Sequence, residues 1–397
     1  MRFPKIRVPK IRVPKTRIPK RVRRGILAAL LVIFAVAAWS FFNALNANNT
    51  DPLSAKSVEW VRNHGGSAIV RWSENFWYSH HQPPPLGKPQ AGSVPTYRAD
   101  TGFSSHPSMP HLPTPKSLET IISPPLQGEG SWTPVGRLVG GYPAVYATYL
   151  RSDPAHTSVV AGIAWMDSQM LRATLFSGND VPGGIGWSNM APLNDAESKR
   201  LVAVFNSGFR MQDANGGYYT DGKTAFPLVQ GAASLVIYRN GTATVAQWGR
   251  DASMGPNVAS VRQNLDLIVD RGKPVPNLLT DNFAKWGATL GNSVLVWRSG
   301  LGVTANGALV YAGGSDLSVY TLANVLAHAG AVRAMELDIN TDWVNYFFFD
   351  QRPGFPASPA NGTKLLPNMI ESLDRYFQPS SRDFITMSAD PRTTPAS

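Results

Sequence analysis

The chain has 397 residues, with 37 basic residues against 26 acidic ones, a net charge of +11 and no cysteine. Without cysteine, a thiol nucleophile, a disulfide and a cysteine-ligated zinc site are all excluded. Eleven of the basic residues lie in residues 1–24, so the rest of the chain carries 26 charges of each sign. Because a nucleic-acid-binding domain needs its own basic surface, we expect no nucleic-acid partner.

The N-terminal 42 residues predict a membrane anchor. Residues 1–24, a basic cytoplasmic tail, repeat a Pro-Lys-x-Arg unit, and proline at every fifth position favours an extended, solvated segment. Residues 25–42 carry no charge and, at about 1.5 Å per residue, would cover roughly 27 Å of bilayer as a transmembrane helix. The basic flank predicts a single-pass plasma-membrane protein with its N-terminus in the cytoplasm, on anionic lipid, and its folded domain outside. A cleaved signal peptide, with small residues at Ala35–Ala37, is the alternative.

Composition divides the remainder of the chain into three parts. Residues 43–130 are expected to form a helical segment, at residues 51–78, followed by a Pro-rich linker from residue 82. Residues 131–378 are long enough for one domain with a substantial core. The polar residues 379–397 are expected to be a disordered tail.

Within the predicted domain, strand signals outnumber helix signals. Two Asn-Gly pairs, Asn240-Gly241 and Asn306-Gly307, separate β-rich runs and predict hairpins. Apolar runs predict strands at residues 159–166, 172–176 and 201–205, and helices are expected at 196–202, 260–269, 317–329 and 368–377. Hairpins with interspersed helices indicate an α+β fold, with a mixed, largely antiparallel sheet and flanking helices, preceded by one transmembrane helix.

The segment after the predicted helix 322–330 is the most informative part of the chain. Residues 332–340 alternate as a strand, which would place Glu336, Asp338 and Asn340 on one face near its end. Strand ends in sheets flanked by helices commonly bind ligands. Paired carboxylates there are equally compatible with a solvated rim, so the pattern alone leaves function open.

The order of several motifs resembles the phosphodiester glycosidase family (N-acetylglucosamine-1-phosphodiester α-N-acetylglucosaminidase-like). The motifs are Phe205-Asn-Ser-Gly-Phe209, a Gly-rich loop at 215–223, residues 298–307, the helix 322–330 and Ala334-Met-Glu-Leu-Asp338. Together they cover about residues 155–350. The chain departs from the family pattern at Ser207 and at Ile339-Asn340, which stand where the family has glycines.

The resemblance implies a hydrolase that cleaves sugar-1-phosphodiester bonds in cell-envelope glycans or glycolipids and uses no cofactor. It implies Asp338 and Glu336 as catalytic carboxyl groups, since glycosidases commonly use two carboxyls. Arg298 and Arg210 would bind the phosphate, because arginine pairs well with phosphate oxygens. Asn206 would hold a sugar hydroxyl.

Asn340 and His328 complete the candidate substrate-binding residues. No metal-ligand set is predicted; only His156 and His328 lie in the domain, so any bound metal would need oxygen ligands. The altered turn after Asp338 keeps a second hypothesis open, in which the protein is a non-catalytic glycan-binding or envelope scaffold module on the same fold.

Overall fold

The computed structural model describes residues 19–49, 51–98, 110–279, 286, 295–350, 352 and 355–393. The chain divides into two compact units, residues 1–47 and 48–397. In the first unit, α1 (Lys20–Leu45) has no buried residue and is long and apolar enough to cross a membrane. A signal sequence near an N-terminus satisfies the same test of length and composition.

The second unit begins with two helices joined by a glycine turn. Helix α2 (Leu53–Val61) and helix α3 (Ser67–His80) are separated by η1 (Arg62–Gly66), where Gly65 has a φ of +85°. Because this left-handed conformation interrupts helical geometry, the glycine pair breaks the helix as expected. Residues 81–98 and 110–132 contain no helix or strand, in agreement with their Pro-rich composition.

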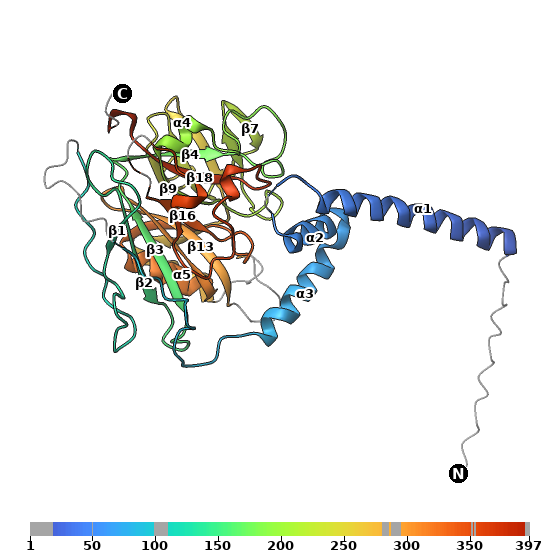
Figure 1. Ribbon diagram of the computed structural model, residues 1–397, viewed down its shortest axis with the longest axis horizontal. Helices are drawn as coiled ribbons and strands as arrows, with labels where there is room; N and C mark the ends of the chain where they lie inside the picture. The colour runs from blue at the N-terminus through green and yellow to red at the C-terminus, as the bar shows by residue number, and fades with distance from the viewer. Residues whose placement is uncertain are drawn as a thin grey trace, which may run out of the picture. The chain divides into compact units, whose positions relative to one another are not determined.

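Three antiparallel sheets make up the body of the second unit (Figure 1). The eight-stranded sheet has the order β1 (Thr133–Val135), β2 (Val145–Arg151), β3 (Val160–Met166), β14 (Leu309–Leu317), β13 (Val296–Thr304), β15 (Ala331–Glu336), β11 (Leu267–Asp270), β12 (Lys273–Pro274). The second sheet has the order β7 (Lys223–Phe226), β6 (Tyr218–Thr220), β10 (Val258–Gln263), β8 (Ala233–Tyr238), β9 (Ala243–Gln247). The third has the order β17 (Gly362–Lys364), β16 (Tyr346–Phe349), β5 (Leu201–Asn206), β18 (Phe384–Ala389), β4 (Leu171–Phe176). The predicted α+β class is confirmed.

Helices are few in this unit. Helix α5 (Val319–His328) begins with a capping box of Ser318 and Thr321. Gly330, at a φ of +91°, follows its last turn. Helix α4 (Asp195–Arg200) begins at the cap residue Asn194. Short 3-10 turns occur at η2 (Pro276–Leu279), η4 (Pro359–Asn361), η5 (Arg375–Phe377) and η6 (Pro391–Thr393).

Both predicted Asn-Gly hairpins are confirmed. Strands β8 and β9 pair up to Ile237 opposite Ala243, and Gly241 between them has a φ of +79°. Strands β13 and β14 pair up to Val303 opposite Leu309, with Gly307 at +89°. Glycine is favoured at both turns because it has no Cβ to oppose a positive φ.

Alternating side chains bury the two faces of the eight-stranded sheet in different layers. Ile163, Val310 and Ala334 belong to a hydrophobic cluster with α5. Their sequence neighbours Ala164 and Leu309 point to the opposite face. There they pack in a second hydrophobic cluster, which also contains residues of the third sheet and of the second sheet. Since side chains alternate along a strand, β15 is covered on both faces, and its end lies where these layers meet.

Two predicted helices are wrong. The expected helix at 260–269 is instead β10 and β11, because Arg262 and Gln263 are buried and pair with groups distant in sequence. Residues 368–377 form turns ending in the short η5 rather than a regular helix. Arg375 and Tyr376 are buried, and the guanidinium of Arg375 pairs with Glu371.

The expected disordered tail is also wrong. Residues 384–389 form β18, an interior strand of the third sheet whose six residues are all buried. The physical reason is that its apolar side chains complete the cores between β4 and β5, although the flanking residues are polar.

We predict that Phe384→Ala lowers the free energy of unfolding by about 3–5 kcal/mol, because it leaves a cavity beside Phe176 and Tyr376. Denaturant unfolding followed by circular dichroism would measure this change. Phe355→Ala is the matched control, since Phe355 is 63% exposed and should change stability by no more than about 0.5 kcal/mol. Equal effects of the two substitutions would contradict the buried position of β18.

Candidate functional site

Asp338 lies two residues after the end of β15, and its backbone is fixed from two sides. Its N–H donates to the Ser207 carbonyl at 3.1 Å. Its own carbonyl accepts hydrogen bonds from Ser299 N at 3.1 Å and from Ser299 Oγ at 2.8 Å. The position of this carboxyl group is therefore set by the loop after β5 and by β13.

The Asp338 side chain is buried and has charged and neutral donors around it. Its Oδ1 accepts from the N–H groups of Ile339 at 2.8 Å and Asn340 at 3.3 Å, and its Oδ2 pairs with Arg382 Nη2. Burial raises the pKa of Asp338 above its ordinary value, while Arg382 and the two N–H groups oppose that rise. Ile339 and Asn340 thus supply two backbone donors to the carboxylate.

Arg382, the partner of Asp338, also contacts an aromatic ring and a second carboxylate. Its guanidinium lies 4.9 Å from the centre of the Trp343 ring, and that of Arg375 lies at the same distance. Arg382 Nη1 is also 3.6 Å from Glu59 Oε1 of α2. We name Arg210, Arg375 and Arg382 the arginine cluster, because Glu59 or the Trp343 ring connects each to the others.

Arg382 is absent from the predicted site because it lies in residues 379–397, the segment expected to be disordered. The signal available was a charged pair, Arg382-Asp383, directly before the apolar run that forms β18. A charged pair at the start of a buried strand has to find partners, since an unpaired buried charge is costly.

Glu336 and Arg298 form an ion pair inside the core. Both side chains are fully buried, with Arg298 Nη1 at 2.5 Å from Glu336 Oε1. Arg298 also donates to the carbonyls of Leu317 at 2.9 Å and Trp286 at 3.0 Å. Burial raises the pKa of Glu336 to about 7, although Arg298 acts to lower it, and nearby Asp338 adds to the rise.

The position of this pair corrects the predicted roles of both residues. Arg298 is a core residue rather than a ligand of substrate phosphate, because its side chain has no exposed surface. Strand β15 ends at Glu336, so the predicted alternation does not extend to Asp338. The two carboxyl groups have different arginine partners, and of the two only Asp338 has any contact with the arginine cluster.

Asn206 is also part of the interior. Its Nδ2 donates to the Ser207 carbonyl at 2.9 Å and Ser299 Oγ at 3.0 Å. Its Oδ1 accepts from Tyr311 Oη at 3.0 Å and Asn345 N at 3.1 Å. An amide side chain has two donor hydrogens and two acceptor positions, so the capacity of Asn206 is filled and none is left for a sugar hydroxyl.

The remaining predicted residues lie in different places. Arg210 is close to the site, since its Nη1 donates to the same Glu59 carboxylate that Arg382 contacts. Asn340 is next to the site through its N–H bond to Asp338. His328 instead lies near the start of β15, where its Nε2 bonds to the Glu119 carbonyl at 2.6 Å. Because β15 is roughly 17 Å long, His328 is outside the site.

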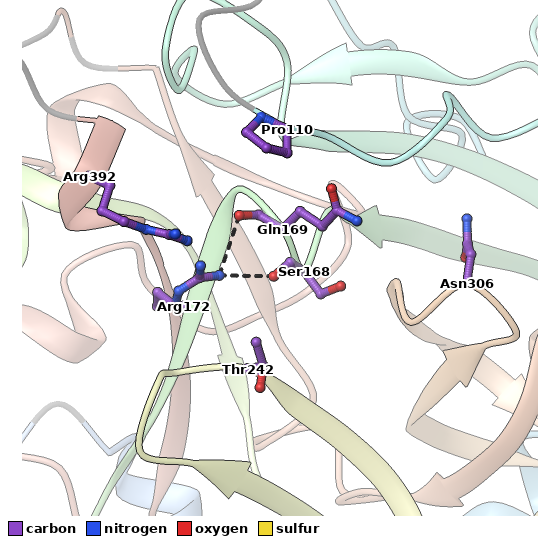
Figure 2. A pocket seen from close by; sticks show the side chains of 7 residues that line it. All are labelled: Pro110, Ser168, Gln169, Arg172, Thr242, Asn306 and Arg392. Carbon is purple, nitrogen blue, oxygen red and sulfur yellow. Dashed lines mark hydrogen bonds between the residues drawn. The ribbon is translucent and has the colours of Figure 1, made fainter.

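A cavity of about 360 Å³ lies elsewhere, among the turns that join β3 to β4, β8 to β9 and β13 to β14 (Figure 2). Arg172 projects into it, with Nη1 bonded to the carbonyls of Ser168 and Gln169 at its rim. It contains none of the candidate residues, and Asn306 places it at the opposite end of β13 from Arg298. The described part of the chain contains no group of three His, Cys, Asp or Glu side chains suited to a metal ion.

We predict that Arg298→Met destabilises the protein by about 3–5 kcal/mol, because it leaves Glu336 buried without a countercharge. Urea denaturation measures the change. Arg250→Met removes an arginine that is partly exposed beside Asp251 and Asp270, and should cost no more than about 1 kcal/mol. An unchanged stability in Arg298→Met would show that the pair is not needed for folding.

Comparisons with known proteins give distant similarities of structure only. No family model and no curated protein matches the chain. The auto-inhibited catalytic domain of zebrafish N-acetylglucosamine-1-phosphodiester α-N-acetylglucosaminidase aligns with 14% identity and a TM-score of 0.42, over 65% of this chain and 87% of that one. A hypothetical protein from Synechocystis aligns with 13% identity and a TM-score of 0.31, over 58% and 59% of the two chains. A putative exported protein from Burkholderia pseudomallei aligns with 12% identity and a TM-score of 0.35, over 60% and 75%.

Proposed function

We propose that this protein is a membrane-tethered hydrolase that cleaves sugar-1-phosphodiester bonds in envelope glycans or glycolipids outside the plasma membrane. The observation that carries the proposal is the pairing of Asp338 with Arg382 at the end of β15, beside Arg210 and Trp343. It combines a carboxylate, which glycoside cleavage needs, with guanidinium groups that can neutralise a phosphodiester.

The chemistry follows from these groups. The bond between the sugar C1 and the phosphate oxygen breaks, and the electron pair leaves with the phosphate, which becomes a phosphomonoester. The Asp338 carboxylate stabilises the positive charge that develops at C1, and water supplies the oxygen of the new C1–OH bond. The proton released from water is taken up by phosphate oxygen or solvent. Arg382 and Arg210 offset the charge on the leaving phosphate, so protonation by a strong acid is unnecessary.

Of the two carboxyl groups predicted to be catalytic, only Asp338 belongs to the proposed site. Glu336 is fully buried behind β15 and is bonded to Arg298, so it acts on Asp338 through its charge and not by contact with substrate. For the location, the proposal relies on the apolar helix α1 and the basic segment before it, which together are typical of an anchor with an outside domain.

One observation favours the second candidate, a non-catalytic glycan-binding or scaffold module. Asp338 is only 5% exposed, and Glu59 of α2 lies against the arginines beside it. A non-catalytic protein would not require a substrate to reach Asp338. The first of the next two predictions distinguishes the candidates, and the second tests the role of Asp338.

We predict that the purified full-length protein releases sugar from at least one member of a panel of glycosyl-1-phosphodiesters that includes sugar nucleotides. Asp338→Asn should lower the rate about 10²–10⁴-fold, because the amide cannot stabilise positive charge at C1. Asp195→Asn, at an exposed position of α4, should retain the wild-type rate. A well-folded protein without turnover on any substrate would favour the binding module.

We further predict that Arg382→Gln moves the acid limb of the kcat/KM profile to higher pH. Arg382 lowers the pKa of the buried Asp338 by favouring its ionised form, so removing it raises that pKa further. The active carboxylate is then protonated, and activity lost, at a higher pH as the solution is acidified. Arg250→Gln should leave the limb in place. An unmoved limb in Arg382→Gln would show that Asp338 is not the group that titrates.

A further inference from the structure

Glu59 of α2 lies at the arginine cluster, although it belongs to the segment before the predicted domain. Its Oε2 accepts from Arg210 Nη1 at 2.7 Å, and its Oε1 lies 3.6 Å from Arg382 Nη1. The other terminal nitrogen of Arg382, Nη2, pairs with Asp338. A single guanidinium group therefore contacts Asp338 on one side and Glu59 on the other.

The two arginines come from separate parts of the fold. Arg210 follows β5 and the Asn206–Phe209 loop, whereas Arg382 precedes β18. Both are largely shielded from solvent: the Arg382 side chain is 8% exposed and that of Arg210 is 14% exposed. Two inward-facing guanidinium groups repel each other unless an anion lies between them, and in this structure the anion is the Glu59 carboxylate.

Charged side chains contribute to the attachment of α2 to the body. Ala55 is its only buried residue, whereas Leu53 is 64% exposed. Its polar anchors are Glu59 and, just before the helix, Asp51, which lies 3.4 Å from Arg375. These pairs are largely shielded from solvent, so α2 can be displaced only if another anion takes the place of its carboxylate beside the arginines.

Glu59 Oε1 has only long contacts to cations. It lies 3.6 Å from Arg382 and 3.8 Å from Arg62, and it has no hydrogen-bond partner among the residues that the structure describes. The Glu59 carboxylate therefore lies between the two arginines with one of its two oxygens, Oε1, lacking a hydrogen bond among the described residues. A phosphodiester carries the same single negative charge and two free oxygens in a tetrahedral arrangement, which two arginines can bind.

We propose that Arg210 and Arg382 form the oxyanion site for the substrate's phosphodiester group, and that Glu59 occupies this site until α2 is displaced. The inference rests on the proposed function for the identity of the substrate. In this proposal, a phosphodiester anion and the Glu59 carboxylate compete for the guanidinium groups of Arg210 and Arg382.

Isothermal titration of dimethyl phosphate into the full-length protein in detergent micelles tests this competition. Glu59→Gln removes the competing charge and is expected to bind dimethyl phosphate at least about tenfold more tightly than the wild-type protein. The matched control is Glu74→Gln, because Glu74 pairs at 2.7 Å with Arg62 of the same helical segment, whereas Glu59 is the acidic residue of that segment that faces Arg210 and Arg382. The control should bind as the wild type does. Adding Arg210→Gln to Glu59→Gln should abolish the gain.

A second measurement needs no variant. If the anion displaces Glu59, saturating dimethyl phosphate should speed hydrogen exchange of the α2 amides in the wild-type protein and leave those of α5 unchanged. This result would support the proposal even if Glu59→Gln failed to fold. Equal affinities of wild type and Glu59→Gln, or unchanged exchange in α2 at saturation, would overturn it.

Failure of the inference can be distinguished from failure of the proposed function, because dimethyl phosphate contains no sugar and its binding does not depend on hydrolysis. Tighter binding by Glu59→Gln without sugar release from any substrate would support the anion site and contradict the enzyme. Sugar release at equal rates and equal anion affinities in wild type and Glu59→Gln would support the enzyme and overturn the role of Glu59.

Discussion

Two consecutive residues, Arg382 and Asp383, form ion pairs that connect the three sheets. Arg382 pairs with Asp338 at the end of β15 in the eight-stranded sheet. Asp383 pairs at 2.7 Å with Arg262 of β10 in the second sheet, and both of these side chains are buried. The chain then continues directly into β18 of the third sheet. Because buried charges need their partners, these pairs fix how the sheets meet, and the candidate site lies at that junction.

The same junction concentrates charge where the protein would otherwise have an apolar core. Arg298 with Glu336 and Arg375 with Glu371 are further buried pairs, and burial raises the pKa of Glu371 to about 7, as it does for Glu336. Such pairs contribute little net stability, since desolvation offsets much of their attraction. Their consequence for function is positional: they orient the groups around Asp338 and place three arginines beside it. In this structure Glu59 supplies the carboxylate that two of these arginines share.

Much of the fold could be predicted from local pattern. The Asn-Gly hairpins, helix α5 with its capping residues, and the strands β3, β4 and β5 follow from turn chemistry and apolar periodicity, which act over a few residues. The errors have one cause. Residues 260–269 and 379–393 contain polar or charged side chains in or beside buried strands, and partners far away in sequence stabilise charged groups there, as Asp383 does for Arg262. No local pattern contains that information.

The sequence by itself determined the apolar N-terminal helix and the antiparallel α+β character, and it placed Asp338 close to the end of a strand, because periodicity and turn residues specify these features locally. Only the tertiary structure decided the rest. It placed Arg298, Glu336 and Asn206 in the interior and brought Arg382, Arg210 and Glu59 to Asp338. These three residues are separated by more than a hundred positions from one another, and only the packing of the sheets and the docking of α2 unite them.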